Sequence, residues 1–205
     1  MTVVSFATSA PELIVSIQAA VSGFPDLAFG NVIGSNIANL AFVLAIIIMI
    51  SPINVGENFY KKDWPMMMGA TILFYLFIVF DKELNRHEGI IMVLILLMFL
   101  FYLIKFQKNQ ANDDIIDDKK RLTIFNTLIF LFLGGFFLWL GSEVLVQGAV
   151  DLATKLGVSE RIISISVVSI GTSIPELSAS IIAIVNKEKA ISLGNLIGSN
   201  IFNIL

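Results

Sequence analysis

The stretch Thr172-Ser173-Ile174-Pro175-Glu176 lies in the middle of an otherwise apolar run that extends from residue 162 to residue 185. The run has the length of a membrane-spanning helix, which needs roughly 20 residues. An acidic residue at the centre of such a helix costs about 2.5–3.5 kcal/mol on insertion scales, and residues of this kind usually mark an ion or substrate path. The stretch therefore predicts a membrane protein with a polar site inside the bilayer.

The same pattern, Thr-Ser-x-Pro-Glu, occurs a second time at residues 8–12. A shift of 164 places residues 3–40 on residues 167–204 without a gap, and about half of the positions are identical. The identities include Gly, Asn, Ser, Pro and Glu, whereas chance similarity between apolar helices would match Leu and Ile. The repeat contains a further motif, Gly-Asn-x-x-Gly-Ser-Asn-Ile-x-Asn, which begins at Gly30 and again at Gly194.

The composition is that of a membrane protein. Hydrophobic residues make up 57% of the 205 residues and charged residues 14%, whereas about a quarter of a soluble domain is charged. The mean hydropathy is +0.88. The net charge of −3 gives no basic surface for nucleic acid. The chain contains no cysteine, and no basic region of a signal peptide precedes the first apolar run.

Seven apolar segments predict an all-α, polytopic membrane protein. They cover residues 1–22, 27–52, 64–80, 89–106, 123–147, 162–185 and 190–205. The loops after the second, fourth and sixth segments carry nine Lys and Arg residues, against four in the loops after the first, third and fifth. The positive-inside rule therefore predicts that the loop at residues 107–122 is cytoplasmic and that residues 81–88 and 151–161 face outward.

The two copies of the repeat are predicted to run in opposite directions, because they begin on the first and the sixth segments and an odd number of spans separates them. This is an inverted-topology repeat, in which the binding site of many transporters lies near the midplane at the repeat interface. A repeat kept only for packing could also be inverted, but it would not need a glutamate in both copies.

Each copy offers oxygen ligands. Pro11 and Pro175 lack an N–H, so the carbonyls four residues earlier lose their helical partner and become expensive in lipid unless they line a polar cavity. Asn and Ser residues form a polar stripe at every fourth position, at Asn31, Ser35 and Asn39 and again at Asn195, Ser199 and Asn203. We expect these stripes to face the two glutamates.

Two further asparagines, Asn36 and Asn200, fall off the stripes, and we expect them to make hydrogen bonds between helices. The glycines of the second motif allow close helix packing, which is the structural explanation of that motif. For the first motif the structural explanation is a proline kink with a glutamate at the membrane surface, and the presence of two copies argues against it.

The ligand types point to a hard cation. Carboxylate, hydroxyl, amide and carbonyl oxygens without Cys or His select Na⁺, Ca²⁺ or Mg²⁺ over zinc or copper. Two buried glutamates without a counter-charge would cost about 5–7 kcal/mol on the insertion scale. Metal ions or protons should therefore occupy the site, and the empty charged site should not move across the membrane.

The two motifs together resemble the alpha repeats of the sodium/calcium exchanger branch of the cation/Ca²⁺ exchanger superfamily. The resemblance covers residues 1–40 and about 137–205. It implies a fold of ten helices in two inverted halves, with residues 1–106 as the first membrane repeat, residues 107–122 as the connecting loop and residues 123–205 as the second repeat. By the same logic a first helix and the last helices are expected to be missing, and the intact protein is expected to have roughly 310 residues.

The resemblance also implies roles for individual residues. Glu12 and Glu176 would be the central Ca²⁺ ligands, and Thr8 and Thr172 would add backbone carbonyls. The Na⁺ sites would involve the hydroxyls of Ser9, Ser35, Ser173 and Ser199 and the carbonyls of Ser5 and Ser169, while Asn39 and Asn203 would close the centre.

Four positions depart from the family pattern or discriminate within it. Ala7 stands where the family usually has Gly, and Asn203 stands where potassium-dependent members have Asp, which makes potassium coupling less expected. The Ca²⁺/H⁺ branch has Glu where this chain has Gly34 and Gly198, which counts against proton coupling without excluding it.

The sequence thus predicts a multi-pass protein of the cell or inner membrane, not an enzyme, that exchanges Na⁺ for Ca²⁺ by alternating access. Its expected partners are the two transported ions and the lipid bilayer, with no nucleic acid and no cofactor. A Ca²⁺/H⁺ or other cation/H⁺ antiporter is the nearest alternative. A cation channel and a non-transporting membrane scaffold are the alternatives from other classes.

Overall fold

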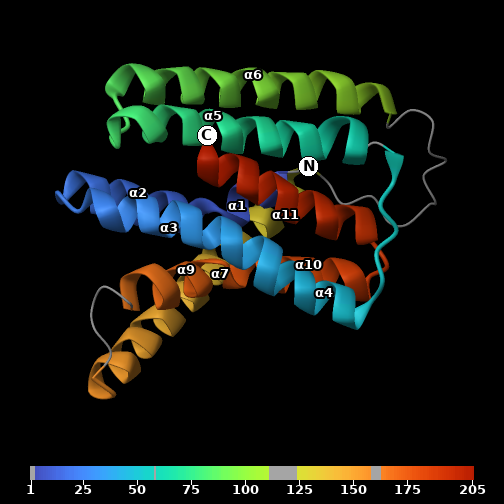
Figure 1. Ribbon diagram of the computed structural model, residues 1–205. Coiled ribbons are helices and arrows are strands. Elements are labelled where there is room, and N and C mark those ends of the chain that lie inside the picture. The colour runs from blue at the N-terminus through green and yellow to red at the C-terminus, as the bar shows by residue number, and fades with distance from the viewer. Residues whose placement is uncertain (1–2, 58, 111–123, 158–162) are drawn as a thin grey trace.

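The computed structural model describes residues 3–57, 59–110, 124–157 and 163–205, and these residues form helices joined by turns, with no strand among them (Figure 1). The described residues of each of the seven predicted apolar segments are mainly helical. The first half contains α1 (Val3–Thr8), α2 (Ala10–Val21), α3 (Pro25–Ile37), the π-helical turn η1 (Ala38–Val43), α4 (Leu44–Ile50), the π-helical turn η2 (Phe59–Asp63), α5 (Trp64–Asp81) and α6 (Arg86–Gln110). The second half contains α7 (Ile124–Lys155), the π-helical turn η3 (Ile163–Val168), α9 (Ser169–Thr172), α10 (Ile174–Val185) and α11 (Lys189–Ile204).

Two helix boundaries differ from the sequence prediction. Helix α7 continues to Lys155, so the first residues of the predicted outward loop at 151–161 are helical. The segment contains no proline, and it ends in a turn at Gly157, whose φ of +75° suits a helix C-terminus. Helix α6 likewise extends to Gln110, into the predicted cytoplasmic loop at 107–122. The rest of that loop and residues 158–162 lie outside the described residues.

The two halves form a shared central block. Helices α2 and α3 pack as a hairpin, α10 and α11 pack as a second hairpin, and α3 and α11 also contact each other. Helix α5 packs on α11, and α5 and α6 lie side by side along the upper side of the block in Figure 1. Helix α7 crosses the opposite side at an oblique angle and contacts η3, α9 and α1.

The turns within the two hairpins have the same geometry. Gly23 in the first turn has a φ of +82°, and its repeat counterpart Lys187 has a φ of +66°. The backbone hydrogen bonds also correspond, since Phe24 N donates to Ala19 O at 2.9 Å and Glu188 N donates to Ala183 O at 2.8 Å. Glycine adopts a positive φ readily, whereas a residue with a Cβ pays for it. The repeat therefore preserves the backbone of this turn even where the sequence has lost the glycine.

Apolar clusters hold the helices together. Val43 and Ile47 pack with Ile184 of α10 and Leu196 of α11. A second cluster joins Met67 of α5, Phe99 of α6, and Ile197 and Ile201 of α11. A third joins Ala70, Met92 and Ile204. Helix α11 is thus packed on one side by the first half's α4 and on the other by α5 and α6.

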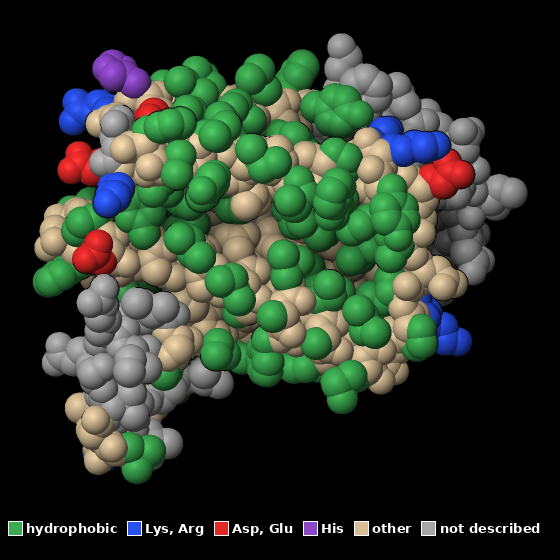
Figure 2. All heavy atoms as spheres, viewed as in Figure 1, with side chains coloured by type: hydrophobic (Ala, Val, Ile, Leu, Met, Phe, Trp, Pro, Cys, Tyr) green, Lys and Arg blue, Asp and Glu red, His purple; other side chains and the backbone are tan. Residues whose placement is uncertain are grey.

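The outer surface is apolar. Large hydrophobic side chains such as Met49, Phe80 and Val21 are 86%, 79% and 83% exposed. Figure 2 shows hydrophobic side chains over the middle of the visible face and charged side chains at its two ends. Three helical stretches among the described residues are long and apolar enough to cross a membrane, Pro25–Ile50, Phe59–Phe80 and Ser166–Val185. A water-soluble protein would not leave such a belt uncovered, whereas lipid covers it without cost.

Candidate functional site

The helix is interrupted at the same place in both repeats. Helix α1 ends at Thr8 and α2 begins at Ala10, and Ser9 between them has φ −85° and ψ 3°. In the second copy Ser173 separates α9 from α10 with φ −84° and ψ 1°. Each proline lies within the first two positions of the helix that follows, where its missing N–H breaks no helical bond. A backbone break therefore lies three residues before each glutamate.

The two glutamates are buried together. Glu12 is 2% exposed and Glu176 is fully buried. The hydroxyl of Ser9 donates to Glu176 Oε1 at 3.0 Å across the repeat interface. Both carboxyl oxygens of Glu12, and Oε2 of Glu176, are buried and have no hydrogen-bond partner within the described part of the chain. Two acidic groups thus converge with at least three unused acceptor oxygens.

Hydrogen bonds from hydroxyl groups join the two halves in matching pairs. The hydroxyl of Ser5 donates to Gly194 O at 3.4 Å, and that of its counterpart Ser169 donates to Gly30 O at 3.4 Å. Thr8 and Thr172 repeat this relation. Thr8 Oγ1 lies 3.4 Å from Asn195 Oδ1 and 3.5 Å from Ser199 Oγ. Thr172 Oγ1 lies 3.4 Å from Asn31 Oδ1 and 3.4 Å from Ser35 Oγ. The interface therefore obeys an approximate twofold relation.

Asn31 and Asn195 fix the two hairpins internally. Asn31 Nδ2 donates to Ser16 Oγ at 3.0 Å and to Glu12 O at 3.2 Å. The counterpart Asn195 Nδ2 donates to Ser180 Oγ at 3.4 Å. These bonds tie α2 to α3 and α10 to α11 beside the glutamates. The two serines were not among the predicted site residues, although they match in the repeat and follow each glutamate by one helical turn.

The off-stripe asparagines behave differently from each other. Asn200 makes the predicted bonds between helices, because its Oδ1 accepts from Asn39 Nδ2 at 3.0 Å and its Nδ2 lies 3.9 Å from Met67 Sδ. For Asn36 the prediction is wrong in this structure. Its Nδ2 donates to Val32 O at 2.7 Å, one turn earlier in the same helix, and its Oδ1 is buried without a partner in the described chain.

The structure brings all twelve predicted site residues to this interface. Eleven of them are buried, at 5% exposure or less, namely Ser5, Thr8, Ser9, Glu12, Ser35, Asn39, Ser169, Thr172, Ser173, Glu176 and Ser199. The twelfth, Asn203, is half-buried, and its Nδ2 has no partner among the described residues. The polar stripes thus face the interface and not the lipid.

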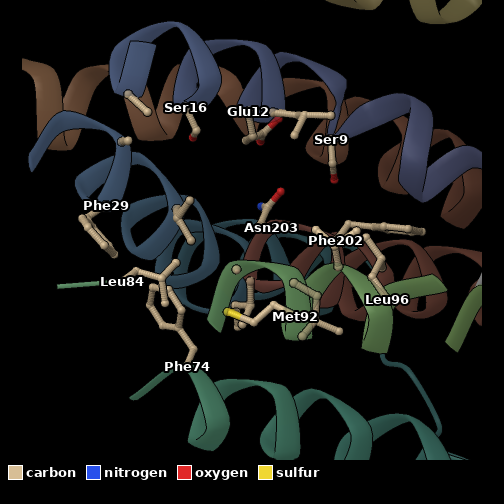
Figure 3. A pocket seen from close by; sticks show the side chains of 18 of the residues that line it. Ser9, Glu12, Ser16, Phe29, Phe74, Leu84, Met92, Leu96, Phe202 and Asn203 are labelled. Carbon is tan, nitrogen blue, oxygen red and sulfur yellow. The ribbon is translucent and has the colours of Figure 1, made fainter. Parts of the chain in front are cut away.

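A cavity of about 540 Å³ adjoins one side of the site, and Ser9, Glu12 and Asn203 face it (Figure 3). The rest of its lining is mainly apolar, with Phe29, Phe74 and Met92 among the side chains. Three of its lining residues, Leu13, Ala20 and Val32, are the repeat counterparts of Leu177, Ile184 and Leu196, which pack around Val43 and Ile47. The cavity therefore occupies the place that η1 and α4 fill in the other half.

The donor set suits a hard cation. Two carboxylates are surrounded by hydroxyl and amide oxygens, and no cluster of three or more His, Cys, Asp or Glu side chains occurs in the described ranges. Oxygen ligands bind Na⁺ and Ca²⁺ in preference to softer metals. Two negative charges match one divalent cation, and the neutral oxygens can complete its coordination.

Comparison with known proteins agrees with this description. The model of the family described as sodium/calcium exchanger protein matches residues 1–105 and 126–205. The putative antiporter CaxA of Alkalimonas amylolytica is 37% identical over 211 residues, which cover 100% of this chain and 66% of that protein. The inner membrane protein YrbG of Escherichia coli strain K12 is 32% identical over 214 residues, which cover 100% of this chain and 65% of that protein.

A solved structure has the same fold. The sodium-calcium exchanger NCX_Mj, soaked with 2.5 mM Na⁺ and 0.1 mM Ca²⁺, superposes with a TM-score of 0.80 at 30% identity, over 99% of this chain and 65% of that one. The chain therefore spans slightly less than two thirds of these relatives. The apolar helices and the membrane relatives together identify a multi-pass integral membrane protein.

Proposed function

Because the chain belongs to the sodium/calcium exchanger protein family, we propose that it forms the ion-binding part of a secondary antiporter that exports Ca²⁺ in exchange for Na⁺ by alternating access. The observation that carries the proposal is the convergence of Glu12 and Glu176, one from each inverted repeat, in a buried cluster of oxygen ligands. In this role the protein moves ions and catalyses no covalent reaction.

The charge of the site explains why exchange should be coupled. With both glutamates ionised and no cation present, two buried negative charges would have to cross the membrane, at a cost of about 5–7 kcal/mol on the insertion scale. One Ca²⁺ or several Na⁺ ions remove this cost. Only the loaded states can then interconvert readily, so that one ion leaves only in exchange for the other.

The proposed ligand roles are those that the family resemblance implies, and the burial of these residues supports them. Glu12 and Glu176 hold Ca²⁺ together with the backbone carbonyls of Thr8 and Thr172, and the amides of Asn39 and Asn203 close the site. Na⁺ uses the serine hydroxyls on the two sides, at Ser9, Ser35, Ser173 and Ser199, with the carbonyls of Ser5 and Ser169. These two carbonyls accept hydrogen bonds from Thr8 and Thr172 at 3.2 Å.

The proposal includes an orientation in the membrane. Residues 107–122 connect the two membrane repeats on the cytoplasmic side, and residues 81–88 face outward. Figure 2 places charged side chains at both ends of the apolar belt, which fits two aqueous faces and does not by itself choose between them.

The experiment that tests the function is ion transport by the purified protein in lipid vesicles. Radioactive Ca²⁺ uptake is measured with an outward Na⁺ gradient and, separately, with a proton gradient of the same size. We expect uptake that requires Na⁺. Uptake driven only by the proton gradient would replace Na⁺ by H⁺, and uptake without any counter-ion would indicate a channel.

The site assignment is tested in the same vesicles. Glu12→Gln and Glu176→Gln each remove one negative charge from the site, and we expect both to abolish exchange. Glu83→Gln removes the same charge at an exposed position outside the site and serves as the matched control. Near-normal exchange in both site variants would refute the assignment and favour a scaffold role.

A further inference from the structure

The twofold relation of the site is broken at two hydrogen bonds. Ser9 donates to Glu176 and Asn39 donates to Asn200, at 3.0 Å each. The repeat shift predicts a counterpart for each bond, from Ser173 to Glu12 and from Asn203 to Asn36. Neither counterpart bond occurs among the described residues. Ser173 Oγ instead donates to Ser169 O in its own half, at 3.0 Å.

The atoms needed for the missing asparagine bond are present and unused. Asn203 Nδ2 and Asn36 Oδ1 are both buried, and neither has a partner in the part of the chain that the structure describes. Their chemistry is complementary, because the first is a donor and the second an acceptor. A bond from Asn203 to Asn36 would also have the same direction as the bond from Asn39 to Asn200, in which the stripe asparagine donates and the off-stripe asparagine accepts. A buried donor and acceptor left unpaired cost free energy.

The hydrogen bond from Asn39 to Asn200 orients the side chain of Asn39, one of the proposed ion ligands. Asn39 gives its amide nitrogen to Asn200, which leaves Asn39 Oδ1 buried and without a hydrogen-bond partner among the described residues. An amide held in this way presents its oxygen, the atom that a hard cation binds. Asn200 is itself held by the contact of its Nδ2 with Met67 Sδ on α5. Asn200 therefore determines which atom of Asn39 is free.

We propose that Asn200 and Asn36 are positioning residues that act in turn on the central amides. Asn200 holds Asn39 in the arrangement described above. Asn36 holds Asn203 when the two halves exchange their arrangements. The inference rests on the proposed function for its ion and its cycle, and it adds two residues outside the ligand set.

The test substitutes leucine, which is similar in size to asparagine and cannot form the hydrogen bond. Asn200→Leu and Asn36→Leu are compared with Asn126→Leu, the same change at an exposed position of α7. Each variant is measured in three ways: thermal unfolding without Ca²⁺, equilibrium Ca²⁺ binding by calorimetry, and Na⁺-driven Ca²⁺ uptake in vesicles.

We expect Asn200→Leu to lower the unfolding temperature by several degrees, to weaken Ca²⁺ binding about tenfold and to slow uptake. We expect Asn36→Leu to leave unfolding and Ca²⁺ binding close to those of the control while slowing uptake about tenfold, because its bond is needed only in the exchanged arrangement. A purely structural role for Asn36 would change stability, binding and uptake together.

Three results would overturn the inference. One is equal loss of Ca²⁺ binding in both variants, since the residues would then act together. Another is normal uptake by Asn36→Leu, and the third is unchanged stability of Asn200→Leu. If the wild-type protein fails to exchange Na⁺ for Ca²⁺, the proposed function fails instead. The unfolding comparison then still decides whether Asn200 holds Asn39.

Discussion

The hydrogen bond from Ser9 to Glu176 provides a matched comparison within one molecule, because Ser173 occupies the equivalent position in the other repeat. Ser9 Oγ donates to Glu176 Oε1 at 3.0 Å, whereas Ser173 Oγ donates to the carbonyl of Ser169 at 3.0 Å. Both serines are buried, at 5% and 1% exposure. Replacing each by alanine therefore removes the same atom from similar surroundings but breaks bonds of different kinds.

The two substitutions are expected to lower stability by different amounts. A hydrogen bond to a charged group contributes about 1.5–3 kcal/mol, and a neutral one about 0.5–1.5 kcal/mol. Ser9→Ala also leaves the buried carboxylate of Glu176 with fewer donors. Ser173→Ala leaves the carbonyl of Ser169 with a second donor, the hydroxyl of Thr172 at 3.2 Å, so its loss should lie at the low end of the neutral range. For a chain of this length 1 kcal/mol corresponds to roughly 2–4 °C, so Ser9→Ala should lower the unfolding temperature by about 3–12 °C and Ser173→Ala by less than about 3 °C.

The assay is thermal unfolding of the purified protein in detergent without Ca²⁺, followed by the fluorescence of its two tryptophans. Addition of Ca²⁺ should reduce the difference between the variants, because a bound cation satisfies Glu176 in place of the hydroxyl. Equal losses for the two variants, or a larger loss for Ser173→Ala, would show that the asymmetry of the site does not exist in solution.

Two further predictions concern the turn and the ion. Lys187→Gly should raise the free energy of unfolding by about 0.5–1 kcal/mol, since Lys187 has a φ of +66° where Gly23 stands in the other repeat; a loss of stability in chemical denaturation would contradict this. Ca²⁺ at about 100 times its dissociation constant should stabilise the protein by about 2.7 kcal/mol. A chelator should reverse the effect, and Glu12→Gln should remove it, whereas an equal Ca²⁺ effect in that variant would exclude Glu12 as a ligand.

The sequence predicted the convergence of the site because duplication supplies information that one copy lacks. A single Thr-Ser-x-Pro-Glu motif allows a kinked surface helix. Two copies in helices of opposite direction must meet if both glutamates are to leave the lipid, and the structure buries Glu12 and Glu176 together. The polar stripes through Ser35 and Ser199 were predictable for the same reason, because hydroxyls at helical spacing cannot face lipid without cost.

The hydrogen-bond partners could not be predicted in the same way. The sequence treats Asn36 and Asn200 as equivalent, yet one donates to its own helix and the other accepts from the opposite repeat. Each of the two bonding patterns satisfies part of an amide, and the choice between them is made by the packed interface, which the sequence does not show. The end of α7 was missed for a simpler reason, since an isolated Gly148 does not stop a helix.

The broken symmetry is a requirement of the proposed function and not a defect of the repeat. Two inverted halves in identical conformations would relate the two membrane faces by the twofold axis, so the site would be equally open or equally closed to both. Access to one face at a time requires the halves to differ, and exchange of their conformations then transfers access to the other face.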